Sequence, residues 1–293
     1  MKHICTKFVA MLLVIAMIAG AFFGNSGWVA TSCYFVGIAA IICSGIILKK
    51  TKMFAGDPSP FVIELPQYHV PSVKTVLLHV WERVWSFLKK AGTILFLCCM
   101  VMWFLATFGV ENGAFGMVED MEASFLAIIG TFLAPIFAPL GFGSWQAVAS
   151  SLSGFVAKEG IVSTMGVLAN MAEATETDAA LWQYVMTDFF HGSALAGFTF
   201  LTFNLLDSPC LAAISTMAKE MGNKGWTAFA VISQNVFAYA VCLMIYQLGS
   251  FAMGGGFGIG TAVAVIVLAA GLYLLFRPAP GAGKKAETAA AGI

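Results

Sequence analysis

No Asp, Glu, Lys or Arg occurs in residues 8–48, and this charge-free run limits how the chain can fold more than any other feature. A helix needs about 20 apolar residues to cross a bilayer, so the run is too long for one crossing and sufficient for two. Overall, 60% of the residues are hydrophobic and 10% are charged. We therefore predict an all-α, polytopic membrane helical bundle, which argues against a soluble domain and against a nucleic-acid partner.

Apolar stretches along the chain predict about eight spans. They are 8–24, 28–48, 92–108, 124–140, 144–168, 193–213, 226–248 and 258–276. The first and fourth are short enough to be re-entrant, a hairpin of two half-spans over 124–168 fits equally well, and a signal peptide is an alternative for the first. Eight crossings from an inside N-terminus put every Lys and Arg except Lys158 on one side. Because cytoplasmic loops are enriched in Lys and Arg, both termini are expected in the cytoplasm.

Prolines and charges divide the chain into four parts. Residues 1–48 hold two spans, 49–91 a cytoplasmic connector, 92–276 the transmembrane core, and 277–293 a disordered cytoplasmic tail. In the connector, Ser72 suits a helix start and apolar residues then recur at helical spacing, which predicts an amphipathic helix at the bilayer surface. This helix can continue into the span after residue 91. It is either a solvated connector packed on the bundle or a lever that couples a cytoplasmic domain to the spans.

Lys158 and Glu159 interrupt the fifth predicted span. A charge near the middle of a membrane helix costs roughly 2.5–3.5 kcal/mol on insertion scales, so the pair indicates a polar cavity or partners. Adjacent helical residues point about 100° apart, so each charge needs a partner elsewhere. In a continuous helix Ser163 would share the face of Glu159, and Ser151 and Ser153 would make the preceding turns small and polar. The alternative is a structural pair that neighbouring helices satisfy, with no transport role.

Two groups of helix-breaking residues interrupt the spans: Pro135, Pro139, Gly141 and Gly143, and the segment Asp207-Ser208-Pro209-Cys210. Irregular backbone at membrane depth is tolerated where it lines a cavity, and transporters bind substrates at such breaks. A Cys210 thiolate beside Asp207 would suit a softer transition metal, although a lone buried cysteine can also be inert. Asn204, Gln234 and Asn235 lie within or near spans and are expected to find hydrogen-bond partners.

The sequence gives little indication of an enzyme active site. Ser151–Gly154 with His191 faintly resembles an intramembrane serine protease, but the predicted topology separates Ser153 from His191 in depth, whereas catalysis needs them hydrogen-bonded. The sequence contains no GxxxxGK[ST] phosphate-binding loop. We expect no enzyme in this chain and no bound cofactor.

Several segments together resemble the ferrous iron transport protein B family (FeoB). Residues 58–95 read PSPFVIELPQYHVPSVKTVLLHVWERVWSFLKKAGTIL, with the family's ELP element at Glu64-Leu65-Pro66 and its WER-x-W-x-FLKKAGT run at Trp81–Thr93. The segment Ser153–Glu159 resembles the second of two gate-type repeats, Ser208-Pro209-Cys210 matches an xPC element, and Gly20–Gly24 resembles the sequence after the first gate. The resemblance covers about residues 10–250. Asp207 departs from it, because the family would have an apolar or aromatic residue there.

The resemblance implies a gate-type repeat at about 124–213, Fe²⁺ as the transported substrate, and a bacterial-type cytoplasmic (inner) membrane. It also implies a GTPase domain, a helical linker and a first gate repeat, which this sequence does not contain. We therefore expect the C-terminal membrane half of such a protein, from a split gene, a truncated reading frame or a degenerate copy. The expected partners are the lipid bilayer, Fe²⁺, a G-domain/first-gate polypeptide and a second copy of the chain in a homo-oligomer.

On this interpretation, Fe²⁺ passes through a polar route between the broken helices. The transport pathway would hold Lys158, Glu159, Ser151, Ser153 and Ser163, the metal ligands would be Glu159, Cys210 and Asp207, and the coupling residues would be Glu64, Trp81, Glu82 and Arg83. Two alternatives remain open: a non-transporting membrane subunit, scaffold or degenerate fragment, and a gate-type permease for another solute.

Overall fold

The computed structural model describes residues 26–51, 54, 72–111, 114–118, 121–158, 160–169 and 179–277. Its elements are α2 (Ser26–Lys49), α3 (Val73–Thr107), β1 (Phe108–Glu111), β2 (Ala114–Met117), η1 (Met121–Ala123), α4 (Phe125–Phe137), η2 (Ala138–Leu140), α5 (Trp145–Val156), α6 (Gly160–Leu168), α7 (Ala179–Tyr184), the π-helical η3 (Val185–Phe189), α8 (Ala194–Leu206), α9 (Leu211–Met221), α10 (Lys224–Ala252) and α11 (Ile259–Phe276). The helical bundle agrees with the predicted fold class. The predicted first span and the tail from residue 278 lie outside the described residues.

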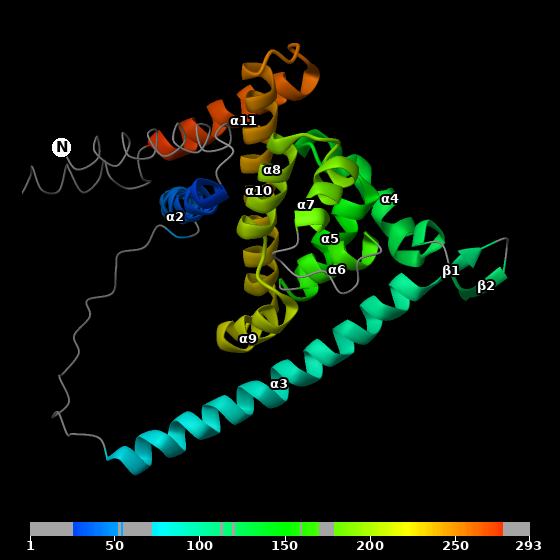
Figure 1. Ribbon diagram of the computed structural model, residues 1–293. Coiled ribbons are helices and arrows are strands. Elements are labelled where there is room, and N and C mark those ends of the chain that lie inside the picture. Colours follow the sequence, from blue (N-terminus) through cyan, green and yellow to red (C-terminus); the bar gives the residue numbers. More distant parts are fainter. Residues whose placement is uncertain are drawn as a thin grey trace, which may run out of the picture.

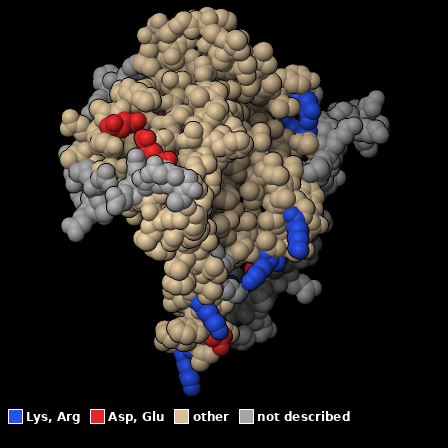
Figure 2. Space-filling model, turned by 90° about the vertical axis from the view of Figure 1, so that its right-hand side faces the viewer, with Lys and Arg blue, Asp and Glu red and all other residues tan. Residues whose placement is uncertain are grey.

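Helices α8 and α10 form the centre of the bundle, with α4 to α7 on one side and α2 and α11 on the other (Figure 1). Most of α8 is buried, because it packs against both α10 and α2. Aromatic rings fill the space between α8 and the α4–α5 connection, where Phe142 contacts Phe137, Phe200 and Phe203. The face drawn in Figure 2 is largely uncharged, with few and scattered acidic and basic side chains. An apolar exterior of this kind fits contact with lipid.

Within the described ranges, α10 and α11 are long and apolar enough to cross a membrane. The pair Phe125–Leu140 and Trp145–Val156 bends by 97° and would add a broken span or a re-entrant loop. Residues Tyr34–Lys49 and helix α8 are shorter apolar helices. The number of eight spans is therefore not confirmed, and the bent pair agrees with the alternative of a hairpin over 124–168.

Helix α3 joins two segments that the sequence analysis treats separately. It begins after Ser72, whose hydroxyl accepts a hydrogen bond from the backbone N–H of Thr75, and it continues for 35 residues. The predicted surface helix and the predicted span 92–108 are thus one continuous helix, and the domain boundary at residue 91 falls inside it. Figure 1 shows the first half of α3 extending away from the bundle, where Trp81 and Trp85 are exposed and stacked.

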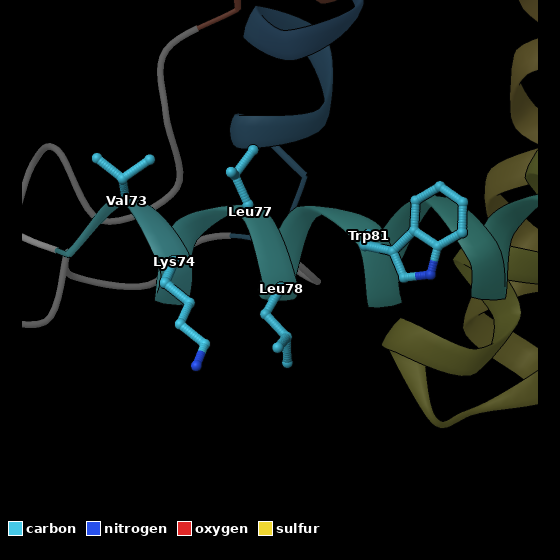
Figure 3. A pocket seen from close by; sticks show the side chains of 5 residues that line it. All are labelled: Val73, Lys74, Leu77, Leu78 and Trp81. Carbon is cyan, nitrogen blue, oxygen red and sulfur yellow. The ribbon is translucent and has the colours of Figure 1, made fainter.

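A shallow apolar hollow lies on the first turns of α3. Its lining residues are Val73, Lys74, Leu77, Leu78 and Trp81, and Figure 3 shows them projecting in different directions from this one helix. Because all five side chains come from a single exposed helix, the hollow is a feature of the surface and encloses no ligand-sized space. It does not contain any of the residues predicted for the transport pathway.

A two-stranded hairpin, β1–β2, follows α3 and was not predicted. Phe108 pairs with Met117 and Glu111 with Ala114 in antiparallel register. Gly109 lies against η1, where a Cβ atom would be 2.0 Å from the carbonyl oxygen of Ala123. Stacking of Phe104, Phe108 and Phe115 attaches the hairpin to the end of α3.

The bend between α4 and α5 confirms the predicted break at Pro139, Gly141 and Gly143, whereas Pro135 lies inside α4 and does not end it. Gly141 has a φ of 93°, which favours glycine, and it ends the short helix η2. Side chains of α10 satisfy carbonyl groups near this helix end: Tyr239 donates to the oxygen of Ile136 at 2.8 Å, and Gln247 to that of Pro139 at 2.7 Å. The irregular backbone is therefore held by α10, as expected inside a membrane protein.

Reciprocal hydrogen bonds join the ends of α2 and α11. The Lys50 ammonium donates to the carbonyl oxygen of Leu275 at 2.5 Å, and the Arg277 guanidinium donates to that of Lys50 at 2.6 Å. Each cation thus satisfies a carbonyl group at a helix C-terminus, where positive charge is favourable. The two ends meet as expected if both lie on the same side of the membrane.

Candidate functional site

The fifth predicted span is wrong as a single helix. Helix α5 ends at Val156 and α6 begins at Gly160, and at Ala157 the backbone turns to an extended conformation. The break separates Ser163, in α6, from Ser151 and Ser153, in α5, so these three serines do not belong to one helix. Ser163 is exposed, whereas Ser151 and Ser153 are buried. Glu159 itself lies outside the described residues.

A second break, at 207–210, confirms the prediction from Pro209. Helix α8 ends at Leu206, Asp207 and Ser208 are non-helical, and Cys210 precedes the first residue of α9. Proline disfavours helical backbone at the residue before it and has no N–H to continue the ladder. The end of α8 therefore leaves carbonyl groups that need other partners.

The two breaks meet through Lys158. Its ammonium forms an ion pair with the Asp207 carboxylate and donates a hydrogen bond of 2.6 Å to the backbone oxygen of Asn204. In a continued helix that oxygen would accept from the N–H of residue 208, so the lysine replaces a hydrogen bond that the break removes. A positive charge at a helix C-terminus is also favourable. Lys158 thus has two roles: it neutralises Asp207, and it caps the C-terminal end of α8.

The ion pair belongs to a connected polar cluster inside the bundle, which we define as Ser151, Lys158, Asn204, Asp207 and Gln234. Asn204 donates to the hydroxyl oxygen of Ser151 at 3.3 Å, and Gln234 donates to the backbone oxygen of Asp207 at 3.1 Å. The cluster therefore links α5, both breaks and α10. The predicted partners for Asn204 and Gln234 are confirmed, and Asn235 donates to the oxygen of Val231 within its own helix.

Burial is uneven across the polar cluster. The Asp207 side chain is 4% exposed, whereas that of Lys158 is 32% exposed. Among the described residues, the buried atoms Asn204 Oδ1, Ser208 Oγ and Thr202 Oγ1 have no hydrogen-bond partner. Natural proteins leave few such atoms unsatisfied, so a water, an ion or another ligand is expected beside them.

The proposed metal ligands are only partly brought together. Asp207 and Cys210 lie in the same break, three residues apart in the sequence. The described part of the chain contains no group of three or more His, Cys, Asp or Glu that could hold a metal ion. Asp207 faces an ammonium here, so a metal ion would have to replace that partner.

The geometry does not support the alternative of an intramembrane serine protease. The Ser153 hydroxyl donates to the backbone oxygen of Ser150 at 2.7 Å, and His191 is exposed in the turn before α8. A Ser–His nucleophile needs these two side chains within hydrogen-bond reach. Ser153 instead stabilises the end of α5.

Three of the predicted coupling residues lie on the exposed half of α3. Trp81, Glu82 and Arg83 are all exposed, and Glu82 is 3.8 Å from the imidazole of His79. Glu64 lies outside the described residues. Nothing in the described part of the chain covers this half of α3, so its surface is available to lipid or to another protein.

Comparison with known proteins identifies the domains that hold these features. Residues 30–83 match the family model described as the ferrous iron transport protein B C terminus, and residues 88–224 match the Gate model, described as nucleoside recognition. The chain carries the C-terminal domains of the FeoB family. Both helix breaks and the Lys158–Asp207 pair fall inside the Gate match.

Curated relatives support this assignment. A Staphylococcus aureus protein (strain MSSA476) named Fe(2+) transporter FeoB is 36% identical over 82% of this chain and 34% of its own length. Proteins of the same name from Methanocaldococcus jannaschii and Salmonella paratyphi A are 32% and 30% identical, over 35% and 40% of their own lengths. The chain thus spans about a third of the length of the curated relatives it matches. No solved structure matches it.

Proposed function

We propose that this chain is the membrane permease part of a ferrous iron uptake system and moves Fe²⁺ across the cytoplasmic membrane. The observation that carries the proposal is the Lys158–Asp207 pair, which has a buried carboxylate and joins two helix breaks inside an apolar bundle. Intramembrane charges at interrupted helices mark substrate pathways in transporters. The curated relatives named Fe(2+) transporter support iron as the substrate.

The proposed route passes through the polar cluster. Ser151 and Ser153 offer hydroxyl oxygens from α5, and Ser163 does so from the exposed side of α6. Glu159 supplies negative charge beside Lys158, and Cys210 is the softer ligand at the second break. Oxygen and thiolate ligands together suit a first-row divalent ion.

We further propose that the permease works with a GTPase domain and a first gate repeat on another polypeptide segment. Residues 61–91, with Glu64, Trp81, Glu82 and Arg83, would receive its motion. Support comes from α3, which is continuous from residue 73 to 107 and can transmit displacement as one rigid helix. About eight spans, cytoplasmic termini and assembly into a homo-oligomer complete the proposal.

The description of the Gate match favours a second candidate, a gate-type permease for a nucleoside or another solute. Such a protein would need no GTPase partner. The two candidates differ in the solute that the protein transports, so one transport assay with Fe²⁺ and nucleosides can compare them.

The test is Fe²⁺ flux into proteoliposomes under reducing conditions, with this chain alone and with a co-reconstituted N-terminal FeoB part. Glu159→Gln should reduce flux at least tenfold, while Glu220→Gln, on the exposed surface of α9, serves as the matched control and should not. Nucleosides in excess should leave Fe²⁺ flux unchanged. Flux that is equal in wild type and Glu159→Gln would refute the role of Glu159, and no Fe²⁺ flux in either reconstitution would refute the permease.

A further inference from the structure

Asp207 carries a buried negative charge that Lys158 screens from the surface. The carboxylate side chain is 4% exposed and the lysine side chain 32%, so the ammonium reaches the surface while its partner does not. Lys158 belongs to the break between α5 and α6 and to neither helix. Its flexible four-carbon stem can move the ammonium toward the exposed side while both helices stay intact.

The ammonium contacts two oxygens of the kind that bind cations. Besides the Asp207 carboxylate, the backbone oxygen of Asn204 is 2.6 Å from the nitrogen of Lys158. Asn204 Oδ1 and Ser208 Oγ are buried and, among the described residues, accept no hydrogen bond. Asn204 is 8% exposed and Ser208 0% exposed. Asn204 lies in the last turn of α8 and Ser208 in the break that follows, so a ligand there could use their oxygens, and Cys210 in the same break would add a softer ligand.

We propose that these atoms form a cation site whose occupant in this conformation is the Lys158 ammonium. A divalent transition-metal ion takes the same place when Lys158 withdraws, so the lysine is a tethered competitor of the transported ion. The inference rests on the proposed permease function, but it concerns a binding equilibrium that can be measured without transport. Carboxylate, carbonyl and thiol ligands together favour Fe²⁺ or Co²⁺ over Mg²⁺.

The test removes the competitor and measures binding. The full chain is purified in detergent with chelator-treated buffers, and its thermal unfolding midpoint is followed with Co²⁺, which is stable in air. In Lys158→Met, saturating Co²⁺ should raise the midpoint by roughly 5 °C, by stabilisation of the metal-bound folded state, and Mg²⁺ should raise it less. Wild type and Lys158→Arg keep the tethered cation and should shift by less than about 1 °C.

The double variant Lys158→Met/Asp207→Asn is the decisive control, because it removes the competitor and the carboxylate together. It should show no Co²⁺ response. A Lys158→Met midpoint that Co²⁺ leaves unchanged, or a Co²⁺ shift that survives in the double variant, overturns the site. If Lys158→Met does not yield folded protein, Lys158→Gln, which keeps a hydrogen-bond donor toward Asp207, takes its place with the same expectations.

Binding and transport fail in distinguishable ways. Co²⁺ binding to Lys158→Met without Fe²⁺ flux in any reconstitution would refute the permease and support the site. Fe²⁺ flux in wild type without Co²⁺ binding to either Lys158 variant would support the permease and refute the site.

Discussion

Removing Lys158 should destabilise the protein far more than removing Asp207, although the two side chains form one ion pair. Lys158→Met leaves a carboxylate that is 4% exposed without its cation. Breaking a buried pair in this way costs about 3–5 kcal/mol, because the remaining charge is neither solvated nor paired. We expect a loss near the lower end, about 3 kcal/mol, because Asp207 can take up a proton instead.

Removing Asp207 instead leaves the Lys158 ammonium unpaired, but this charge is better solvated. In Asp207→Asn, Lys158 keeps its hydrogen bond to the Asn204 backbone oxygen and remains 32% exposed, so solvent reaches the ammonium. The new amide can still accept from it. The expected cost is about 1–2 kcal/mol, the range for a hydrogen bond to a charged group.

The double variant Lys158→Met/Asp207→Asn should lose about 2 kcal/mol, because no buried charge remains. The two single losses sum to roughly 4–5 kcal/mol, so the coupling energy should be about 2–3 kcal/mol. The free energy of unfolding is measured by equilibrium denaturation in mixed micelles, with chelator present so that no metal ion replaces the lysine.

The pair His79 and Glu82 supplies a matched control cycle. These side chains are 72% and 64% exposed, three residues apart on α3, so their coupling should stay below about 0.5 kcal/mol. Equal single losses at Lys158 and Asp207 with a coupling as small as this control would refute the reasoning. The pair would then be solvated, and Asp207 would not be the buried charge on which the cation site depends.

Two further predictions concern the breaks and their surroundings. Gly141→Ala should destabilise the protein by about 3 kcal/mol or more, because an added Cβ would be 2.1 Å from the Tyr246 ring and the φ of 93° would be strained. Gly222→Ala is the control, with a φ of 59° and open space around it. It should cost about 1–2 kcal/mol in the same denaturation assay. In single-cysteine variants, maleimide should label Cys210 at least tenfold faster than Cys242, since the former is half-buried and the latter 0% exposed; equal rates would contradict the packing of α8 against α10.

Local signals in the sequence predicted much of the bundle. The predicted spans 226–248 and 258–276 agree with α10 and α11, because length and apolar content are decided within each segment. The predicted span 28–48 agrees with α2 as a helix, although its apolar part, Tyr34–Lys49, is shorter. The helix start at Ser72 and the break at Pro209 are equally local, since one depends on a side-chain cap and the other on a missing N–H.

The hairpin β1–β2 had a signal that could have predicted it. Asn112-Gly113 is the dipeptide most typical of two-residue hairpin turns, and apolar residues flank it. The high apolar content of the region favours a prediction of membrane spans. The strands, by contrast, are short and depend on the packing of Phe108 against Phe115.

The break after Val156 depends on tertiary contacts. No proline occurs in 144–168, and apolar residues run through the segment, so its local pattern predicts one helix. The chain leaves the helix where Lys158 reaches the end of α8, 46 residues away in sequence. An argument from the local pattern of the fifth span could not anticipate this, because it assumed one continuous helix over 144–168.

The partner of Lys158 was not predicted, although the predicted spans hold few charges. Those spans contain one basic residue, Lys158, and two acidic ones, Glu159 and Asp207. Each charge was expected to find a partner elsewhere, and the structure gives Asp207 as the partner of Lys158. Glu159 gives the predicted fifth span a further acidic residue, and a charge at membrane depth is costly. A mobile cation beside Glu159 would complete the balance, which is the electrostatic argument for a cation route at this site.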